Sequence, residues 1–177
     1  EGRNIYRNIK KSILFLLSCN FGEIIALFLA ILLGWATPLR PIHILWVNLI
    51  TDTLPALSLG VDPEDPDVMK EKPRHAKESL FSGSVPFLIF NGVIIGLLTL
   101  IAFIAGAKFY TGDTNLFPLF PERIDDDALL HAQTMAFVVL SFSQLVHSFN
   151  LRSRTKSIFS IGIFTNKYLV FSLLIGV

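Results

Sequence analysis

Four long apolar stretches dominate this sequence and leave few folds open to it. They cover about residues 13–35, 42–60, 85–107 and 130–150, and a fifth apolar stretch occupies residues 167–177. Because about 20 apolar residues in a helix cross the hydrocarbon core of a bilayer, each of the first four is long enough to span a membrane. The pattern therefore predicts an all-α membrane protein, a bundle of transmembrane helices whose fifth span is truncated.

The composition agrees with a membrane protein. Charged residues make up 16% of the 177-residue chain and the mean hydropathy is +0.59, whereas a soluble domain has about 25% charged residues. The net charge of +1 gives no electrostatic reason to expect a nucleic-acid partner. The single cysteine, Cys19, has no second cysteine to pair with, which argues against a disulfide framework and a cysteine-based zinc site.

The basic residues are unevenly distributed and predict which loops face the cytoplasm. Most of them lie at the start of the chain, in the loops at 61–84 and 151–166, or at the start of the fifth span: Arg3, Arg7, Lys10, Lys11, Lys70, Lys72, Arg74, Lys77, Arg152, Arg154, Lys156 and Lys167. The positive-inside rule places these segments, and hence the N-terminus, in the cytoplasm. The remaining polar loop, at about residues 108–129, is compact and falls on the outer side. Together with the short basic loops it favours a bacterial plasma membrane.

The loop at 61–84 contains closely spaced acids, beginning with Asp62, that superficially resemble a calcium-binding loop. Pro63 and Pro66 interrupt them, and the central glycine and terminal glutamate of an EF-hand are missing at the required spacing. We therefore expect these acids to contact a cytoplasmic domain rather than to bind calcium.

Polar side chains lie near the centres of the first two spans. The first span contains Asn20 and Glu23, and the second contains Asn48, Thr51 and Asp52, whose i, i+3, i+4 spacing puts all three on one face of an α-helix. A charged group at the bilayer centre costs at least about 2.5–3.5 kcal/mol, so an acid there is a functional candidate by default. A protonated, hydrogen-bonded structural glutamate is the alternative for Glu23.

Pro55 and Gln144 bear on the same candidate site. Pro55 has no N–H to bond the Thr51 carbonyl four residues back, so this oxygen needs another partner. Oxygen ligands with few charges suit a hard cation such as Ca²⁺, which takes six to eight of them, and the set has no cysteine or histidine to favour zinc or copper. Gln144, near the middle of the fourth span, either adds a carbonyl oxygen or bonds a neighbouring helix.

Two further features of the spans are interpreted as structural. His147 lies towards the cytoplasmic end of the fourth span, alone among apolar residues. Gly92 and Gly96 in the third span have the small-xxx-small spacing that allows close helix approach.

Several of these segments together resemble a known family. The stretch Trp46-Val47-Asn48-Leu49-Ile50-Thr51-Asp52, the following Leu54-Pro55-Ala56, the earlier Asn20-Phe21-Gly22-Glu23 and the opening Glu1-Gly2-Arg3 are similar to the last membrane helices of P-type calcium ATPases. This group includes the sarco/endoplasmic reticulum pump. The resemblance extends over the whole chain and implies the fifth to eighth helices, and part of the ninth, of a ten-helix pump.

The resemblance also implies roles for individual residues. Asn20 and Glu23 would be calcium ligands on the fifth helix of the pump, and Asn48, Thr51 and Asp52 on the sixth, with Asp52 bridging two ions. Gln144 stands where two-calcium pumps have a glutamate. This departure resembles plasma-membrane-type calcium pumps, whereas the retained Glu23 points the other way, so one ion and two ions per cycle both stay open.

The resemblance implies an ATP-driven pump that exports Ca²⁺ from the cytoplasm. The phosphorylation motif, the nucleotide pocket and the fourth-helix glutamate of the family have no counterpart in these residues, so the chain alone contains no catalytic residue and should not hydrolyse ATP. ATP and Mg²⁺ would act in the parent protein only. The expected partners are the calcium ion, the lipid bilayer and the missing N-terminal helices and cytoplasmic domains.

We expect proton counter-transport, because burial favours a protonated carboxyl group whereas a bound cation favours an ionised one. Glu23 and Asp52 would bind Ca²⁺ when ionised and take up protons after release. A secretory-pathway-type pump for Mn²⁺ and Ca²⁺ is one alternative. A non-ATPase channel or secondary transporter using the same carboxylates is another. A passive membrane anchor would have no need for two acids at the midplane.

Overall fold

The computed structural model describes residues 2–63, 83–112, 124–152 and 162–176. Most of the predicted loop at 61–84 lies outside the described residues, and so do Glu64, Asp65 and Asp67. The same holds for much of the predicted loop at 151–166 and of the polar segment after residue 108.

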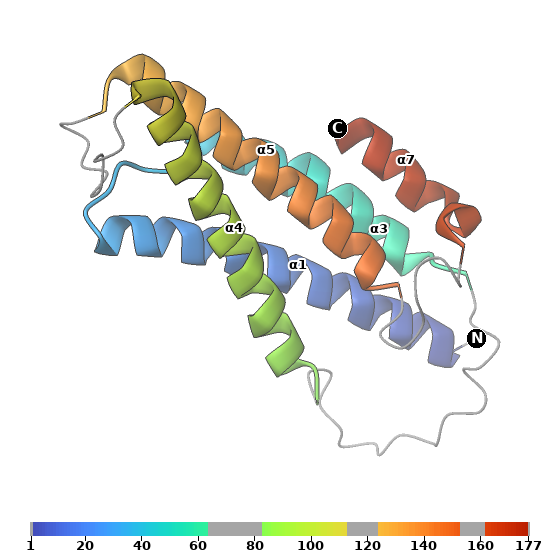
Figure 1. Ribbon diagram of the computed structural model, residues 1–177. Helices are drawn as coiled ribbons and strands as arrows, with labels where there is room; N and C mark the ends of the chain where they lie inside the picture. The colour runs from blue at the N-terminus through green and yellow to red at the C-terminus, as the bar shows by residue number, and fades with distance from the viewer. Residues whose placement is uncertain (1, 64–82, 113–123, 153–161, 177) are drawn as a thin grey trace.

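All of the described elements are helical, which confirms the prediction of an all-α bundle (Figure 1). They are, in chain order, α1 (Gly2–Leu32), α2 (Pro41–Trp46), η1 (Val47–Asp52), α3 (Thr53–Gly60), α4 (Val85–Thr111), α5 (Asp126–Asn150), η4 (Ile163–Thr165) and α7 (Lys167–Gly176). Here α2, η1 and α3 follow each other without a break and form one rod, Pro41–Gly60. This rod, α1, α4 and α5 are long and apolar enough to cross a membrane.

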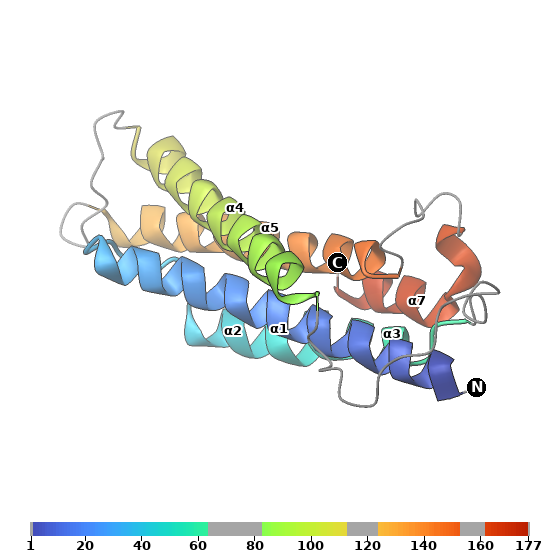
Figure 2. The same ribbon diagram turned by 90° about the horizontal axis from the view of Figure 1, so that it is seen from below.

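Prolines and glycines mark the helix ends. Pro41 starts the rod and Pro86 lies in the first turn of α4, where the missing proline N–H costs no helical hydrogen bond. After α4, Gly112 adopts a left-handed φ of 68° and its N–H bonds the Lys108 carbonyl, closing the helix. Between α1 and the rod the chain reverses direction, so that α1 and α3 lie alongside each other (Figure 2).

Helix α4 crosses α1 at very close range. A Cβ atom added to Gly96 would lie 2.8 Å from the Gly22 carbonyl oxygen, and one added to Gly92 would lie 3.0 Å from the Ser18 carbonyl oxygen. These distances are too short for a larger side chain. The close helix approach predicted from Gly92 and Gly96 is therefore confirmed, and α1 is the partner.

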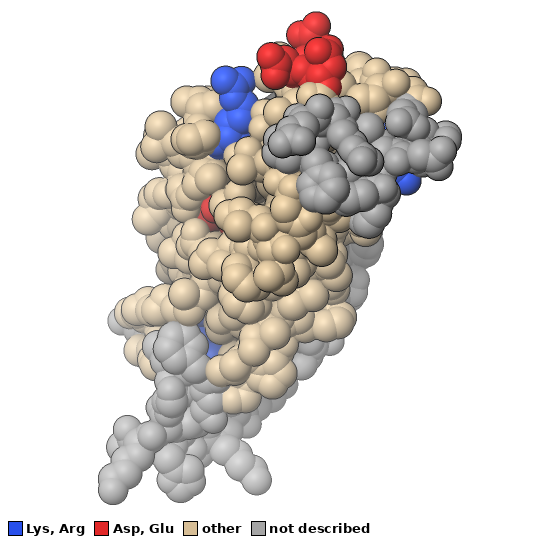
Figure 3. All heavy atoms as spheres, turned by 90° about the vertical axis from the view of Figure 1, so that its left-hand side faces the viewer, with Lys and Arg blue, Asp and Glu red and all other residues tan. Residues whose placement is uncertain are grey.

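Most of the outer surface is apolar. Phe28, Ile31 and Phe109 are each at least 60% exposed. On the face shown in Figure 3 the described charges gather mainly towards one end, where the exposed acids Asp125, Asp126 and Asp127 lie at the start of α5. Such a surface suits lipid or further membrane helices.

Candidate cation-binding site

A thin polar layer separates two apolar clusters inside the bundle. One cluster contains Ala26 of α1, Val47 of η1 and Leu140 of α5. The other cluster contains Cys19 of α1, Ala56 of α3 and Leu151 after α5. Helix α1, the rod and helix α5 therefore each pass from one apolar cluster to the other. The polar side chains between the two clusters meet at the same depth.

Four of the site residues predicted from the sequence lie in this layer. On α1 the layer holds Glu23, which is 5% exposed. On η1 it holds Thr51 and Asp52, which are 0% and 1% exposed, and on α5 it holds Gln144, which is 0% exposed. Among residues enclosed by apolar neighbours, polar groups are costly unless they are hydrogen-bonded or bind a ligand.

Gln144 connects α5 to α1 and to the rod through its side-chain amide. Its Nε2 donates to Glu23 Oε1 at 2.9 Å, and its Oε1 accepts a hydrogen bond from the Thr51 hydroxyl at 3.0 Å. The sequence left open whether Gln144 bonds a neighbouring helix or adds an oxygen to the site. The structure shows bonds to two neighbours and also places its carbonyl oxygen in the polar layer.

The segment that carries Thr51 and Asp52 is a π-helix rather than an α-helix. Single π-helical turns inside α-helices occur frequently at functional sites. Asn48 at the start of this turn is exposed, yet its Nδ2 lies 3.5 Å from Glu23 Oε2, at the long limit of a hydrogen bond. Asn48 and Asp52 thus face Glu23 on α1, whereas the Thr51 hydroxyl bonds Gln144 on α5. Asn48 lies at the edge of the site.

Pro55 follows the π-helical turn and is buried. Without an N–H, it cannot bond the Thr51 carbonyl in the usual α-helical pattern. Nearby, the Asn48 carbonyl accepts a hydrogen bond from the Thr53 hydroxyl at 2.7 Å. Pro55 thus removes the usual α-helical donor of the Thr51 carbonyl, which makes this oxygen a further candidate ligand.

Asp52 has the most unusual surroundings in the layer. Neither of its carboxylate oxygens has a hydrogen-bond partner among the described residues. Glu23 is close enough to interact with it electrostatically, and the Cys19 thiol approaches it without forming a hydrogen bond of good geometry. A buried carboxylate without donors is costly, and a bound cation would satisfy it.

Cys19 was not predicted to belong to this site. Its side chain is fully buried and lies next to Asp52. Its position four residues before Glu23, and hence on the same face of α1, is the signal that could have placed it there. As a thiol it is a poor ligand for a hard cation, so it contributes the wall of the site rather than an oxygen.

Asn20 is the predicted residue that the structure does not connect to the others. Its Nδ2 donates to the Leu16 carbonyl of its own helix at 2.9 Å, and no hydrogen bond to Glu23 is found among the described residues. Its Oδ1 is not engaged in that bond, so a change of rotamer would be needed for it to join Glu23.

The charge of the layer limits what it can bind. In the described ranges, no group of three His, Cys, Asp or Glu side chains is close enough together to hold a metal ion. A cation site in this layer would combine the two carboxylates with neutral oxygens from Thr51, Gln144, Asn48 and the backbone. Calcium accepts such a mixture of carboxylate and neutral oxygens at flexible geometry.

A family model described as cation transporting ATPase, C-terminus, matches residues 36–177. The chain belongs to this family. The resemblance to the C-terminal membrane region of P-type calcium ATPases is thereby confirmed. In this member of the cation transporting ATPase C-terminal family, the matched region begins just before the rod and includes Thr51, Asp52 and Gln144, whereas Glu23 precedes it.

Relatives of known name agree with the family. The chain is 98% identical over 177 residues to calcium-transporting ATPase 1 of Bacillus cereus, covering 100% of this chain and 20% of that protein. It is 46% identical over 171 residues to the calcium-transporting ATPase of Bacillus subtilis, covering 96% of this chain and 17% of that protein. It is also 35% identical over 190 residues to an endoplasmic reticulum-type calcium-transporting ATPase 3 of Arabidopsis thaliana, covering 99% and 19%. The chain thus spans about a fifth of the length of these relatives.

Proposed function

We propose that this chain is the ion-binding membrane domain of an ATP-driven calcium pump, which exports Ca²⁺ from the cytoplasm and carries protons in return. The observation that supports it most is the buried, unpartnered carboxylate of Asp52 beside Glu23 in a polar layer between two apolar clusters. The names of the relatives, all calcium-transporting ATPases, favour calcium as the cargo.

In this proposal the ligands are Glu23, Asn48, Thr51, Asp52 and, after a change of rotamer, Asn20. Gln144 orients Glu23 and Thr51 through its two hydrogen bonds and offers its carbonyl oxygen when Thr51 turns towards the ion. Two negative charges match the charge of one Ca²⁺. Binding would displace protons from the two carboxyl groups, and release on the other side would let protons return.

The remaining parts of the pump lie outside this chain in the proposal. Phosphorylation, nucleotide binding and the Mg²⁺ and ATP that they need belong to other domains of the parent protein. The basic end of the bundle, with the N-terminus, would face the cytoplasm of a bacterial cell, since Lys and Arg concentrate at cytoplasmic membrane boundaries. The described basic residues at that end include Arg7, Lys11, Arg152 and Lys167.

The experiment compares Ca²⁺-dependent ATP hydrolysis by the full-length pump with that of Asp52→Asn. Asparagine keeps the size of the side chain but removes the charge, so we expect calcium activation to be lost. Asp126→Asn is the control, because Asp126 is an exposed acid at the start of α5, far along the helix from the site. Unchanged calcium activation in Asp52→Asn would refute the site. A titration with Mn²⁺ in the same assay tests whether manganese replaces calcium.

A further inference from the structure

A second buried polar cluster lies at the end of the bundle where the N-terminus is found, and it is centred on Asp62. The Asp62 carboxylate accepts hydrogen bonds from three side chains: Lys11 Nζ at 2.8 Å, Arg152 Nε at 3.1 Å and Asn166 Nδ2 at 2.9 Å. Its backbone carbonyl accepts a fourth, from Asn8 Nδ2 at 2.8 Å. We call Asp62 and these partners the Asp62 clasp.

The clasp is shielded from solvent to an unusual degree for charged residues. The side chains of Asp62 and Arg152 are 5% and 2% exposed, and that of Lys11 is 12% exposed. Because removing charges from water is costly, a buried ion pair adds little net stability, but removal of one partner leaves the other charge uncompensated. Such an arrangement is better suited to fixing one geometry than to stabilising the fold.

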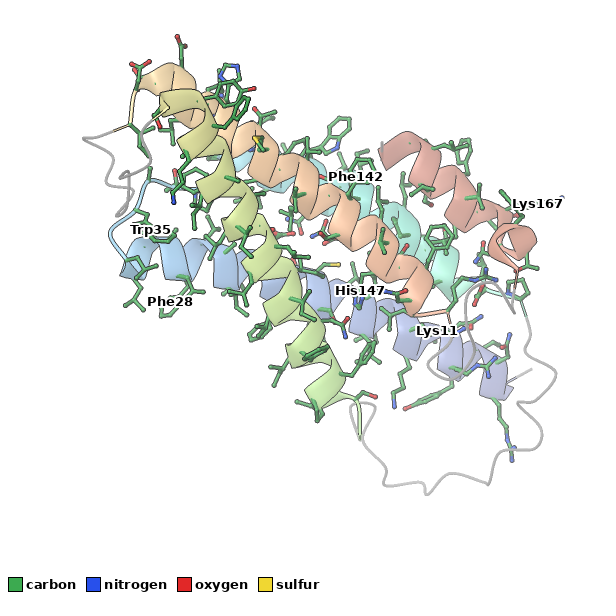
Figure 4. All side chains as sticks on the ribbon, viewed as in Figure 1. Lys11, Phe28, Trp35, Phe142, His147 and Lys167 are labelled. Atoms are coloured by element: carbon green, nitrogen blue, oxygen red, sulfur yellow. The ribbon has the colours of Figure 1, made fainter. Side chains whose placement is uncertain are left out.

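Lys11, Arg152 and Asp62 lie on, or directly after, helices that reach the polar layer. Lys11 belongs to α1, which carries Glu23, and Arg152 follows α5, which carries Gln144. Asp62 follows α3, which continues the π-helical turn of Thr51 and Asp52. At 1.5 Å per helical residue, the clasp lies roughly 12–18 Å along these helices from the site. In Figure 4, Lys11 and Lys167 lie at this end of the bundle and Trp35 at the opposite end.

The clasp also connects α7 to the rod. Asn166 Nδ2 donates to the Ser58 carbonyl as well as to Asp62, and Asn166 Oδ1 caps α7 by accepting from the Leu169 N–H at 3.0 Å. Farther along, the hydroxyls of Ser58 and Ser172 are 2.8 Å apart. The end of α3 is thus bonded to Asn166 and α7 on one side and to α1 on the other.

We infer that Asp62 is a positioning residue for the cation site, holding α1, α3 and α5 in register so that Glu23, Asp52 and Gln144 meet at one depth. The inference rests on the proposed calcium-pump function. The chain between the clasp and the polar layer is helical except for the one or two residues after α3 and α5, so a shift or rotation at the clasp reaches the polar layer without passing through a long loop. Loss of the clasp therefore weakens calcium binding although no clasp residue touches the ion.

The test measures the calcium concentration for half-maximal ATPase activity, together with the maximal rate, in the full-length pump. We expect Asp62→Asn to raise that concentration about three- to tenfold, the range typical of residues that act at a distance through a packed network. Lys11→Met removes one of the two cations and should shift it in the same direction. The double variant should be no weaker than Asp62→Asn alone, because both changes break one network. Lys167→Met, which removes an exposed cation at the same end, should leave it unchanged.

The possible results separate the two proposals. If the wild-type pump is not activated by calcium, the proposed function is refuted and this inference with it. If the wild type is activated and Asp62→Asn has the same half-maximal concentration, with only a lower yield or maximal rate, Asp62 is merely structural and the inference alone is refuted. If Asp62→Asn cannot be recovered in folded form, Lys11→Met decides: a raised half-maximal concentration supports the clasp, and an unchanged one overturns it.

Discussion

The side-chain amide nitrogen of Gln144 on α5 donates a 2.9 Å hydrogen bond to the Glu23 carboxylate on α1, and the two residues are 121 positions apart in the sequence. The carbonyl oxygen of the same amide accepts a hydrogen bond from the Thr51 hydroxyl. One neutral side chain thereby sets the orientation of two proposed ligands, which makes it a sensitive point for mutation.

Gln144→Leu should weaken calcium binding by about tenfold or more, a loss typical of partners that orient metal ligands. Leucine has a similar volume, but it removes the amide donor from Glu23 Oε1 and leaves the Thr51 hydroxyl with the Val47 carbonyl of its own helix as acceptor. The measurement is equilibrium calcium binding to the purified full-length pump. Gln133→Leu is the matched control, since Gln133 lies on the same helix, is 7% exposed and bonds only the Thr37 carbonyl among the described residues. Equal affinities in the two variants would contradict the role of Gln144.

Pro55→Ala should increase thermal stability and at the same time reduce calcium affinity. Alanine restores a backbone N–H that can bond the Thr51 carbonyl, and it favours a helix interior by about 3 kcal/mol over proline. The restored bond draws the π-helical turn towards a regular α-helix and removes an oxygen from the site. Thermal inactivation and calcium activation, measured on one preparation, test both effects. A gain in stability with unaltered affinity would show that the Thr51 carbonyl is not a ligand.

Gly96→Ala should destabilise the bundle by about 1–3 kcal/mol, the usual cost of overpacking. The added methyl group would lie 2.8 Å from the Gly22 carbonyl oxygen, so α4 must move away from α1. Gly60→Ala is the control, because its added methyl group would lie 3.6 Å from the nearest atom, Ser12 Oγ, which is an ordinary contact. The test compares thermal inactivation midpoints of the two variants; a midpoint for Gly96→Ala equal to that of Gly60→Ala would argue against close contact of α1 and α4.

Removal of calcium should lower the thermal stability of the wild-type pump. A ligand at 100 times its dissociation constant stabilises the state that binds it by about 2.7 kcal/mol. Chelation should therefore lower the unfolding midpoint of the wild type and leave that of Asp52→Asn almost unchanged. An equal shift in both proteins would mean that the stabilising calcium binds elsewhere.

The apolar runs were sufficient to predict an all-helical bundle, because hydrophobic length is a local property of the sequence. Helix α1 nevertheless begins at Gly2, well before the apolar run at residues 13–35. Hydropathy marks the part of a helix that suits lipid and does not register its polar extension. That extension contains Asn8 and Lys11, two members of the Asp62 clasp.

The arrangement of the site was only partly predictable. Acids within long apolar stretches stand out in a sequence, so Glu23 and Asp52 were predicted directly as candidate ligands. The π-helical turn was not predicted, because it is defined by backbone hydrogen bonds and residues 47–52 show no sequence pattern that distinguishes it from an α-helix. Asp62 was expected to contact another domain, whereas its carboxylate binds side chains that lie 51, 90 and 104 residues away. Pairings over such separations arise from tertiary packing and leave no local pattern.

Because of the π-helical turn at Val47–Asp52, the site depends on the number of residues in this segment as well as on their side chains. Its wider repeat holds one more residue than an α-helical turn over the same rise. Deleting one residue there would let the rod revert to a continuous α-helix, with Ile44 on one side and Leu59 on the other still facing their present neighbours. The rod would pack as before, yet the bulge that presents Thr51 and Asp52 would be gone. In this segment a one-residue deletion should be tolerated by the fold and fatal to transport.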